Sequence, residues 1–66
     1  MNGELFSVYW EDPSGRVHRE VVHVGRDEAA RAWQRLTRGP AAQLGLVKGV
    51  KLTDSLDRLV HEWEKP

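Results

Sequence analysis

The chain repeats itself weakly at a distance of 42 residues. Residues 12–20 align with residues 54–62, and an aspartate, an arginine and a glutamate stand at identical places in the two segments. Apolar residues upstream and downstream of these segments coincide as well. Since residues 12–20 have the pattern of a turn followed by a strand, the repeat predicts a second hairpin near the C-terminus.

The first hairpin is expected over residues 5–24. Residues 5–11 alternate between two faces and are rich in aromatic and β-branched side chains, which is typical of a strand. The Asp-Pro-Ser-Gly run at residues 12–15 has turn formers in their preferred places. With these four residues as the loop, Trp10 lies opposite Val17.

A helix is predicted over residues 27–38. Asp27 is a favourable N-cap, and apolar residues recur with helical spacing from Ala29 to Leu36. Gly39 followed by proline is a typical helix stop. Residues 39–45 are expected to form a connecting loop.

Residues 46–64 admit two interpretations. Leu56, Leu59, Val60 and Trp63 have helical spacing, whereas the repeat matches Val17 of the first hairpin with Leu59. We prefer a second hairpin, with a four-residue loop that places Leu52 opposite Leu59. The expected fold is α+β, a ββ-α-ββ single domain over residues 1–66 with a four-stranded, mostly antiparallel sheet and one helix packed on one face.

Strand alternation divides the apolar residues between two faces of this sheet. The expected core consists of Phe6, Val8, Trp10, Val17, Val21, Ala29, Ala32, Trp33, Leu36, Val50, Leu52, Leu59 and Trp63. The face that a single helix leaves uncovered is expected to carry Leu5, Ser7, Tyr9, His18, Glu20, Val22, Val24, Val47, Val60 and Glu62.

The composition argues against an enzyme. The chain has no cysteine, and its serines lie in a predicted strand and two turns rather than in a nucleophile elbow. Its three histidines lack the further ligands that a zinc site needs, and no glycine-rich phosphate loop is present. We therefore expect no catalytic residues, no metal and no cofactor. The cysteine-free composition and the lack of a long apolar run favour a cytoplasmic protein with no membrane segment.

The leading hypothesis is a protein-interaction module, for instance a small accessory protein or inhibitor that docks on a larger partner. Apolar side chains on a face that the chain cannot cover itself suggest a protein partner or self-association. The candidate interaction residues are Leu5, Tyr9, Val22, Val24 and Val60.

The alternative is a small nucleic-acid-binding module. The ten basic and ten acidic residues cancel, but residues 25–51 hold six of the basic and two of the acidic ones. Arg31, Arg35 and Arg38 recur with helical spacing opposite the apolar stripe, and arginine side chains are well suited to bind phosphates. Zero net charge removes the overall attraction expected of a general nucleic-acid binder, which makes this alternative the weaker one.

Overall fold

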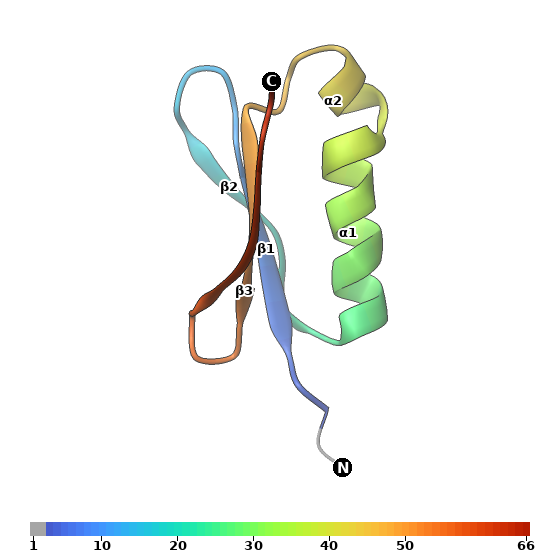
Figure 1. Cartoon of the computed structure of the whole chain (residues 1–66), viewed down its shortest axis with the longest axis vertical. Coiled ribbons are helices and arrows are strands. Elements are labelled where there is room, and N and C mark those ends of the chain that lie inside the picture. Colours follow the sequence, from blue (N-terminus) through green and yellow to red (C-terminus); the bar gives the residue numbers. More distant parts are fainter. Residues whose placement is uncertain (1–2) are drawn as a thin grey trace.

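A computed structural model describes residues 3–66 of the chain (Figure 1). The elements follow in the order β1 (Phe6–Glu11), β2 (Val17–Val24), α1 (Arg26–Arg38), α2 (Pro40–Gln43), β3 (Gly49–Asp54) and β4 (Leu59–Glu64). The strands form one antiparallel sheet in the order β2-β1-β3-β4, and α1 packs mainly on β1, β2 and β3. The predicted α+β, ββ-α-ββ architecture is confirmed, and residues 53–64 belong to a hairpin rather than a helix.

The 42-residue repeat becomes an approximate two-fold symmetry of the sheet. β1 corresponds to β3 and β2 to β4. Exchanging them gives the same strand order, read from the opposite edge of the sheet. Tyr9 lies opposite Lys51, its own counterpart in the repeat, so the axis passes between these two residues. The two hairpin tips consequently lie at opposite ends of the sheet (Figure 1).

Both hairpins close with the same turn. The N–H of Asp12 donates to the carbonyl of Arg16 and its carbonyl accepts from the N–H of Gly15, both at 2.9 Å, and the same two bonds recur 42 residues later at 3.0 Å. Gly15 has φ 91° and the equivalent Asp57 has φ 62°. The loop therefore comprises residues 13–15, with a left-handed residue in its last position, as is common in three-residue hairpin loops.

This turn shifts β2 by one residue from the predicted register. Trp10 lies opposite His18, not Val17. Because a one-residue slip exchanges the two faces of a strand, Val17 and Arg19 turn away from α1, while His18 and Glu20 turn toward it. The assignment of Val17 to the core is therefore wrong, and so is the assignment of His18 and Glu20 to the uncovered face.

Irregularities in β2 restore the apolar side chains to the helix side. The register shifts after Arg19, so that Val21 lies opposite Val8 and packs against the core. A second irregularity includes His23, which has φ 54°. Val24 then also packs against the core, which corrects its predicted place on the uncovered face. Bulges of this kind bend a strand and redirect its side chains.

The second hairpin is also displaced from its predicted register. Leu52 lies opposite His61 and Val50 opposite Trp63, whereas the repeat predicted that Leu52 faces Leu59. His61 and Trp63 thus lie on the helix side of β4. Leu59 is 54% exposed, so its predicted place in the core is wrong.

Helix α1 begins one residue earlier than expected, and the Asp27 side chain makes no capping hydrogen bond. It ends at Arg38, and the N–H of the following Gly39 donates to the carbonyl of Arg35 at 3.0 Å. A β-carbon at this position would overlap the same carbonyl oxygen, so the turn requires glycine. The short helix α2 occupies part of the segment that was expected to be loop.

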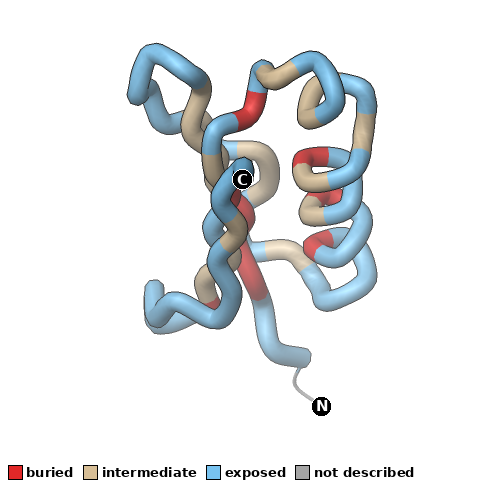
Figure 2. Tube along the Cα trace, turned by 45° about the horizontal axis from the view of Figure 1, so that its top comes forward, coloured by how far each residue is buried: buried red, intermediate tan, exposed pale blue. Residues whose placement is uncertain are grey.

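The core lies between α1 and the middle of the sheet (Figure 2). Its buried members are Phe6, Val8, Ala29, Ala32, Leu36, Val47 and Val50, with Trp10, Val21, Val24, Trp33, Ala41, Leu52 and Trp63 partly buried around them. Val47, which alternation assigned to the uncovered face, is fully buried. It precedes β3 and is not part of a strand, so alternation does not apply to it.

Candidate functional site

The face of the sheet opposite α1 has Tyr9 near its centre. Tyr9 lies between Arg19 on β2 and Lys51 on β3, and Lys51 is followed by Glu62 on β4. The Nζ of Lys51 is 3.9 Å from Oε2 of Glu62, and both side chains are largely exposed. Tyr9 is half-buried. It therefore presents an aromatic ring with charged residues on the neighbouring strands.

The next row of this face is hollow because it contains a glycine. Gly49 lies between Glu11 on β1 and Glu64 on β4, and Val17 continues the row on β2. Val17 is 64% exposed. The Nζ of Lys48 is 3.9 Å from Oε2 of Glu11. The absence of a side chain at Gly49 leaves a depression between two carboxylates.

This depression has a volume of about 340 Å³ and extends along the sheet from Val17 to Thr53. We call it the outer hollow. The hydroxyl oxygen of Thr53 is buried and has no hydrogen-bond partner among residues 3–66. A buried hydroxyl without a partner is unfavourable, but this oxygen has essentially no exposed surface and is not open to a ligand in the hollow.

The five predicted interaction residues do not form one patch. Leu5 and Val22 are exposed, at 41% and 40%, and Tyr9 lines the outer hollow. Val24 packs against the core, and Val60 lines a different depression on the helix side of the sheet. Sequence alternation missed Val17, which the shifted register brings to the outer face.

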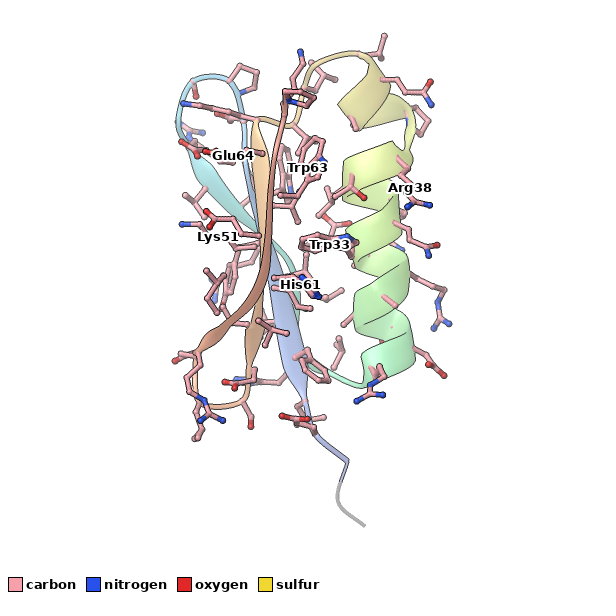
Figure 3. All side chains as sticks on the ribbon, viewed as in Figure 1. Trp33, Arg38, Lys51, His61, Trp63 and Glu64 are labelled. Carbon is pink, nitrogen blue, oxygen red and sulfur yellow. The ribbon has the colours of Figure 1, made fainter. Side chains whose placement is uncertain are left out.

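The second depression lies between α1 and the edge strand β4, and we call it the α1–β4 groove. It has a volume of about 390 Å³, and it is lined by Phe6, Arg26, Ala29, Ala30, Trp33, Gln34, Leu52, Val60 and His61. The rings of Trp33 and His61 are 5.9 Å apart. Figure 3 shows Trp33, His61 and Trp63 between the sheet and α1, with Lys51 and Glu64 on the opposite side of β4.

The predicted arginine stripe is only partly available. Nη2 of Arg35 lies 3.1 Å from Oε2 of Glu20, which the shifted register brings to the helix side. Arg31 and Arg38 are exposed and make no ion pair with the residues that the structure describes. The stripe therefore offers two unpaired cations rather than three.

The carboxylates of the two hairpin tips stabilise the turns. Oδ1 of Asp12 accepts the N–H groups of Ser14 and Arg16, and Oδ2 lies 2.9 Å from Nε2 of His18. The hydrogen bond with His18 is the main cause of a pKa well below the ordinary 3.8 of this carboxyl. His18 in turn stacks on Trp10, with ring centroids 4.3 Å apart.

Asp54 has the equivalent role at the other tip. Its Oδ1 accepts the N–H groups of Leu56 and Arg58 at 2.9 Å, and Nε of Arg58 donates to Oδ2 at 2.9 Å. The backbone bond from Arg58 is the main cause of its lowered pKa. The repeated aspartates are thus explained by turn geometry, which is a structural role.

The serine hydroxyls of the first hairpin are also engaged in structural bonds. Oγ of Ser7 accepts the N–H of His23 at 3.0 Å, and Oγ of Ser14 donates to Asp12 at 2.6 Å. Within residues 3–66, no three His, Cys, Asp or Glu side chains lie close enough together to hold a metal ion. No helix in the same part of the chain is long and apolar enough to cross a membrane.

Comparison of the chain with models of protein families, with curated proteins and with solved structures finds no match.

Proposed function

We propose that this protein is a non-enzymatic interaction module that docks on a larger protein through the outer face of its sheet. The observation that carries the proposal is the outer hollow, which lies on the face that α1 leaves uncovered. Tyr9 and the exposed Val17 provide apolar contact area there. An uncovered sheet face that carries apolar side chains is a candidate surface for a protein partner.

The centre of this surface holds an aromatic side chain. Aromatic residues are enriched among the side chains that dominate binding energy, and Tyr9 lies in the middle of the face. Lys51, Glu62 and Glu64 form a charged rim on the β3–β4 side, which favours a defined orientation of the partner. We infer an accessory or inhibitory role in the cytoplasm, where a cysteine-free chain is at no disadvantage.

The test is capture of partners from a lysate of the source organism on the immobilised full chain, with and without nuclease. Tyr9→Ala is expected to weaken the captured interaction at least about thirtyfold, as truncation of a central interface residue does. Val22→Asp, which puts a charge at an exposed position of β2, is expected to weaken it as well. Leu44→Asp is the matched control, because Leu44 is 73% exposed and follows α2, away from the sheet.

Circular dichroism of each variant checks that the fold is retained. Sedimentation velocity of the purified chain checks whether the partner is a second copy, which the same two substitutions would then dissociate. Unchanged binding by both Tyr9→Ala and Val22→Asp in a folded protein would overturn the proposal.

A second candidate function is binding of nucleic acid through α1. It is favoured by the exposed and unpaired Arg31 and Arg38. Against it, Arg35 is paired with Glu20 and Trp33 packs against the core, so no aromatic ring on that face is free to stack on a base.

Titration of labelled duplex and single-stranded DNA over a range of salt concentrations tests this candidate. If three arginines contact phosphates, the logarithm of the binding constant should fall with the logarithm of the salt concentration, with a slope of about −2 to −3. The triple substitution of Arg31, Arg35 and Arg38 by alanine would then remove binding, whereas Arg16→Ala in the first turn would not. Full affinity of the triple variant for DNA would show that nucleic acid does not bind through this face of α1.

A further inference from the structure

The free edge of β4 has backbone groups that no described residue uses. The N–H of Lys65 donates to the carbonyl of Lys48 at 3.0 Å, just beyond the paired ends of β3 and β4. Hydrogen-bonded and non-hydrogen-bonded pairs alternate along an antiparallel ladder. The peptide groups of Trp63 therefore face β3, whereas those of Glu62 and Glu64 face away from it. β4 is the last strand of the sheet on this side, so these groups are open to another strand.

The other edge of the sheet is poorly suited to strand addition. β2 contains two irregularities, one of which includes His23 with φ 54°. Glu20, at the first of them, is held to α1 through Arg35. Bulges are a common protection of edge strands against unwanted pairing. β4 has a single irregularity, near its start, and is regular from His61 to Glu64.

The α1–β4 groove lies beside this open edge. A strand added to β4 would lie about 4.8 Å away from it, with alternate side chains on the helix side of the sheet. There the groove presents Trp33 from α1 and Val60 and His61 from β4. Val60 is 44% exposed. Apolar side chains of an added strand would cover these residues.

The charges on the other side of β4 indicate what kind of strand fits. Glu62 has only a distant ion pair with Lys51, and Glu64 has none among residues 3–66. Both carboxylates point away from the groove. Opposite charges on directly facing strand positions are favourable and like charges unfavourable. A basic residue opposite each glutamate would therefore be preferred.

The same charges disfavour a second copy of β4 as the occupant. Antiparallel pairing of two copies centred on Glu62 would place this residue opposite itself. Pairing centred on Trp63 would place Glu62 opposite Glu64 of the other copy. Both arrangements bring carboxylates together on the outer side of the strands. Pairing centred on His61 would avoid this by placing Glu62 opposite Val60, but it would use the irregular start of β4.

We propose that β4 and the α1–β4 groove form a strand-addition site for an extended segment of a partner protein in which basic and apolar residues alternate. The apolar residues enter the groove and the basic residues face Glu62 and Glu64. Backbone hydrogen bonds supply much of the affinity in this mode of recognition, and the alternate side chains supply the specificity. The site shares Glu62 and Glu64 with the rim of the outer hollow but uses the edge of β4 and the α1–β4 groove. Tyr9→Ala and Val22→Asp leave that edge and that groove unchanged, so the two proposals can fail separately.

The experiment uses the full chain, labelled with ¹⁵N, and a synthetic eight-residue peptide of alternating lysine and valine with blocked ends. The expected result is a set of saturable amide shifts in residues 59–64 and in α1 around Trp33. A control peptide of alternating glutamate and valine is expected to bind at least about tenfold more weakly. The double variant Glu62→Lys/Glu64→Lys should reverse this preference, whereas Glu4→Lys/Glu28→Lys, with the same change in net charge, should not.

Glu62→Pro tests the backbone pairing when it is compared with Glu62→Gln, which removes the same carboxylate but keeps the backbone N–H. Since the N–H of Glu62 points away from β3, proline there removes no bond to β3 but blocks the edge, and binding of the peptide should be lost. The lysine–valine peptide with every amide N-methylated tests the same point without changing the protein. Equal affinity for the two unmethylated peptides, or undiminished binding after either block, would overturn the proposal. Concentration-dependent self-association that Glu62→Pro abolishes would overturn it too, because the occupant would then be a second copy.

Discussion

Substitution of Val47 by alanine tests whether the segment between α2 and β3 packs into the core. Val47 has no exposed surface and belongs to the core cluster. Replacing it removes two methyl groups, a transfer loss of about 1.6 kcal/mol. Incomplete collapse of the space left behind adds up to about 1 kcal/mol. We therefore expect Val47→Ala to lower the free energy of unfolding by about 2 to 3 kcal/mol.

That loss is large for a domain of 66 residues, whose total stability is expected to be about 3 to 10 kcal/mol. It corresponds to a fall in Tm of about 10 to 20 °C. Urea unfolding followed by tryptophan fluorescence, together with thermal melts followed by circular dichroism, measures both quantities.

Leu44→Ala is the control for Val47→Ala, since Leu44 lies three residues away and is 73% exposed. It should change stability by less than about 0.5 kcal/mol. Equal, small effects of the two substitutions would show that Val47 faces solvent, as strand alternation predicts, and would refute the packing described above.

Three further outcomes are expected. Gly39→Ala should destabilise the fold by about 1 to 3 kcal/mol in urea unfolding because its β-carbon would overlap the Arg35 carbonyl, whereas Gly3→Ala, which has open space around it, should be neutral. The pKa of Asp54 is lowered, so the native state binds a proton at this carboxyl less readily than the unfolded chain does. The stability that Asp54 contributes is therefore fully present above about pH 5 and is lost as the pH falls through 3.8 and below. Asp54→Asn should make the acid side of a curve of unfolding free energy against pH flatter, and an unchanged curve would contradict this reasoning. Asp57→Gly should raise Tm by a few degrees because it relieves a left-handed backbone at φ 62°, and a fall in Tm would show that the aspartate side chain outweighs that strain.

The general architecture could be predicted from local patterns. Helix α1 follows from the spacing of its apolar residues and from the Gly-Pro stop, both of which act within a few residues of the chain. The hairpin at the C-terminus follows from the repeat, because the turn around Asp54 makes the same hydrogen bonds as the turn around Asp12. These features depend on local chemistry, which the sequence displays directly.

The faces of β2 and β4 could not be predicted in the same way. A turn of three rather than four loop residues moves Val17 to the outer face, and bulges return Val21 and Val24 to the core. A change of one residue in register reverses every side chain that follows it. Composition does not reveal such a change, although the glycine at position 15 is the signal that could have indicated the shorter loop.

The candidate sites depended still more on tertiary structure. Alternation alone places Tyr9 and Val22 on the outer face, but the outer hollow exists because Gly49 falls between Glu11 and Glu64 on three adjacent strands. The α1–β4 groove exists because α1 packs mainly on the other three strands and leaves the edge strand uncovered. The sequence by itself therefore determined the four strands, helix α1 and their order, since these arise from local turn and helix chemistry, whereas the short helix α2 was not predicted. Register, faces and cavities were decided by the tertiary structure, because they depend on contacts between residues that lie far apart in the chain.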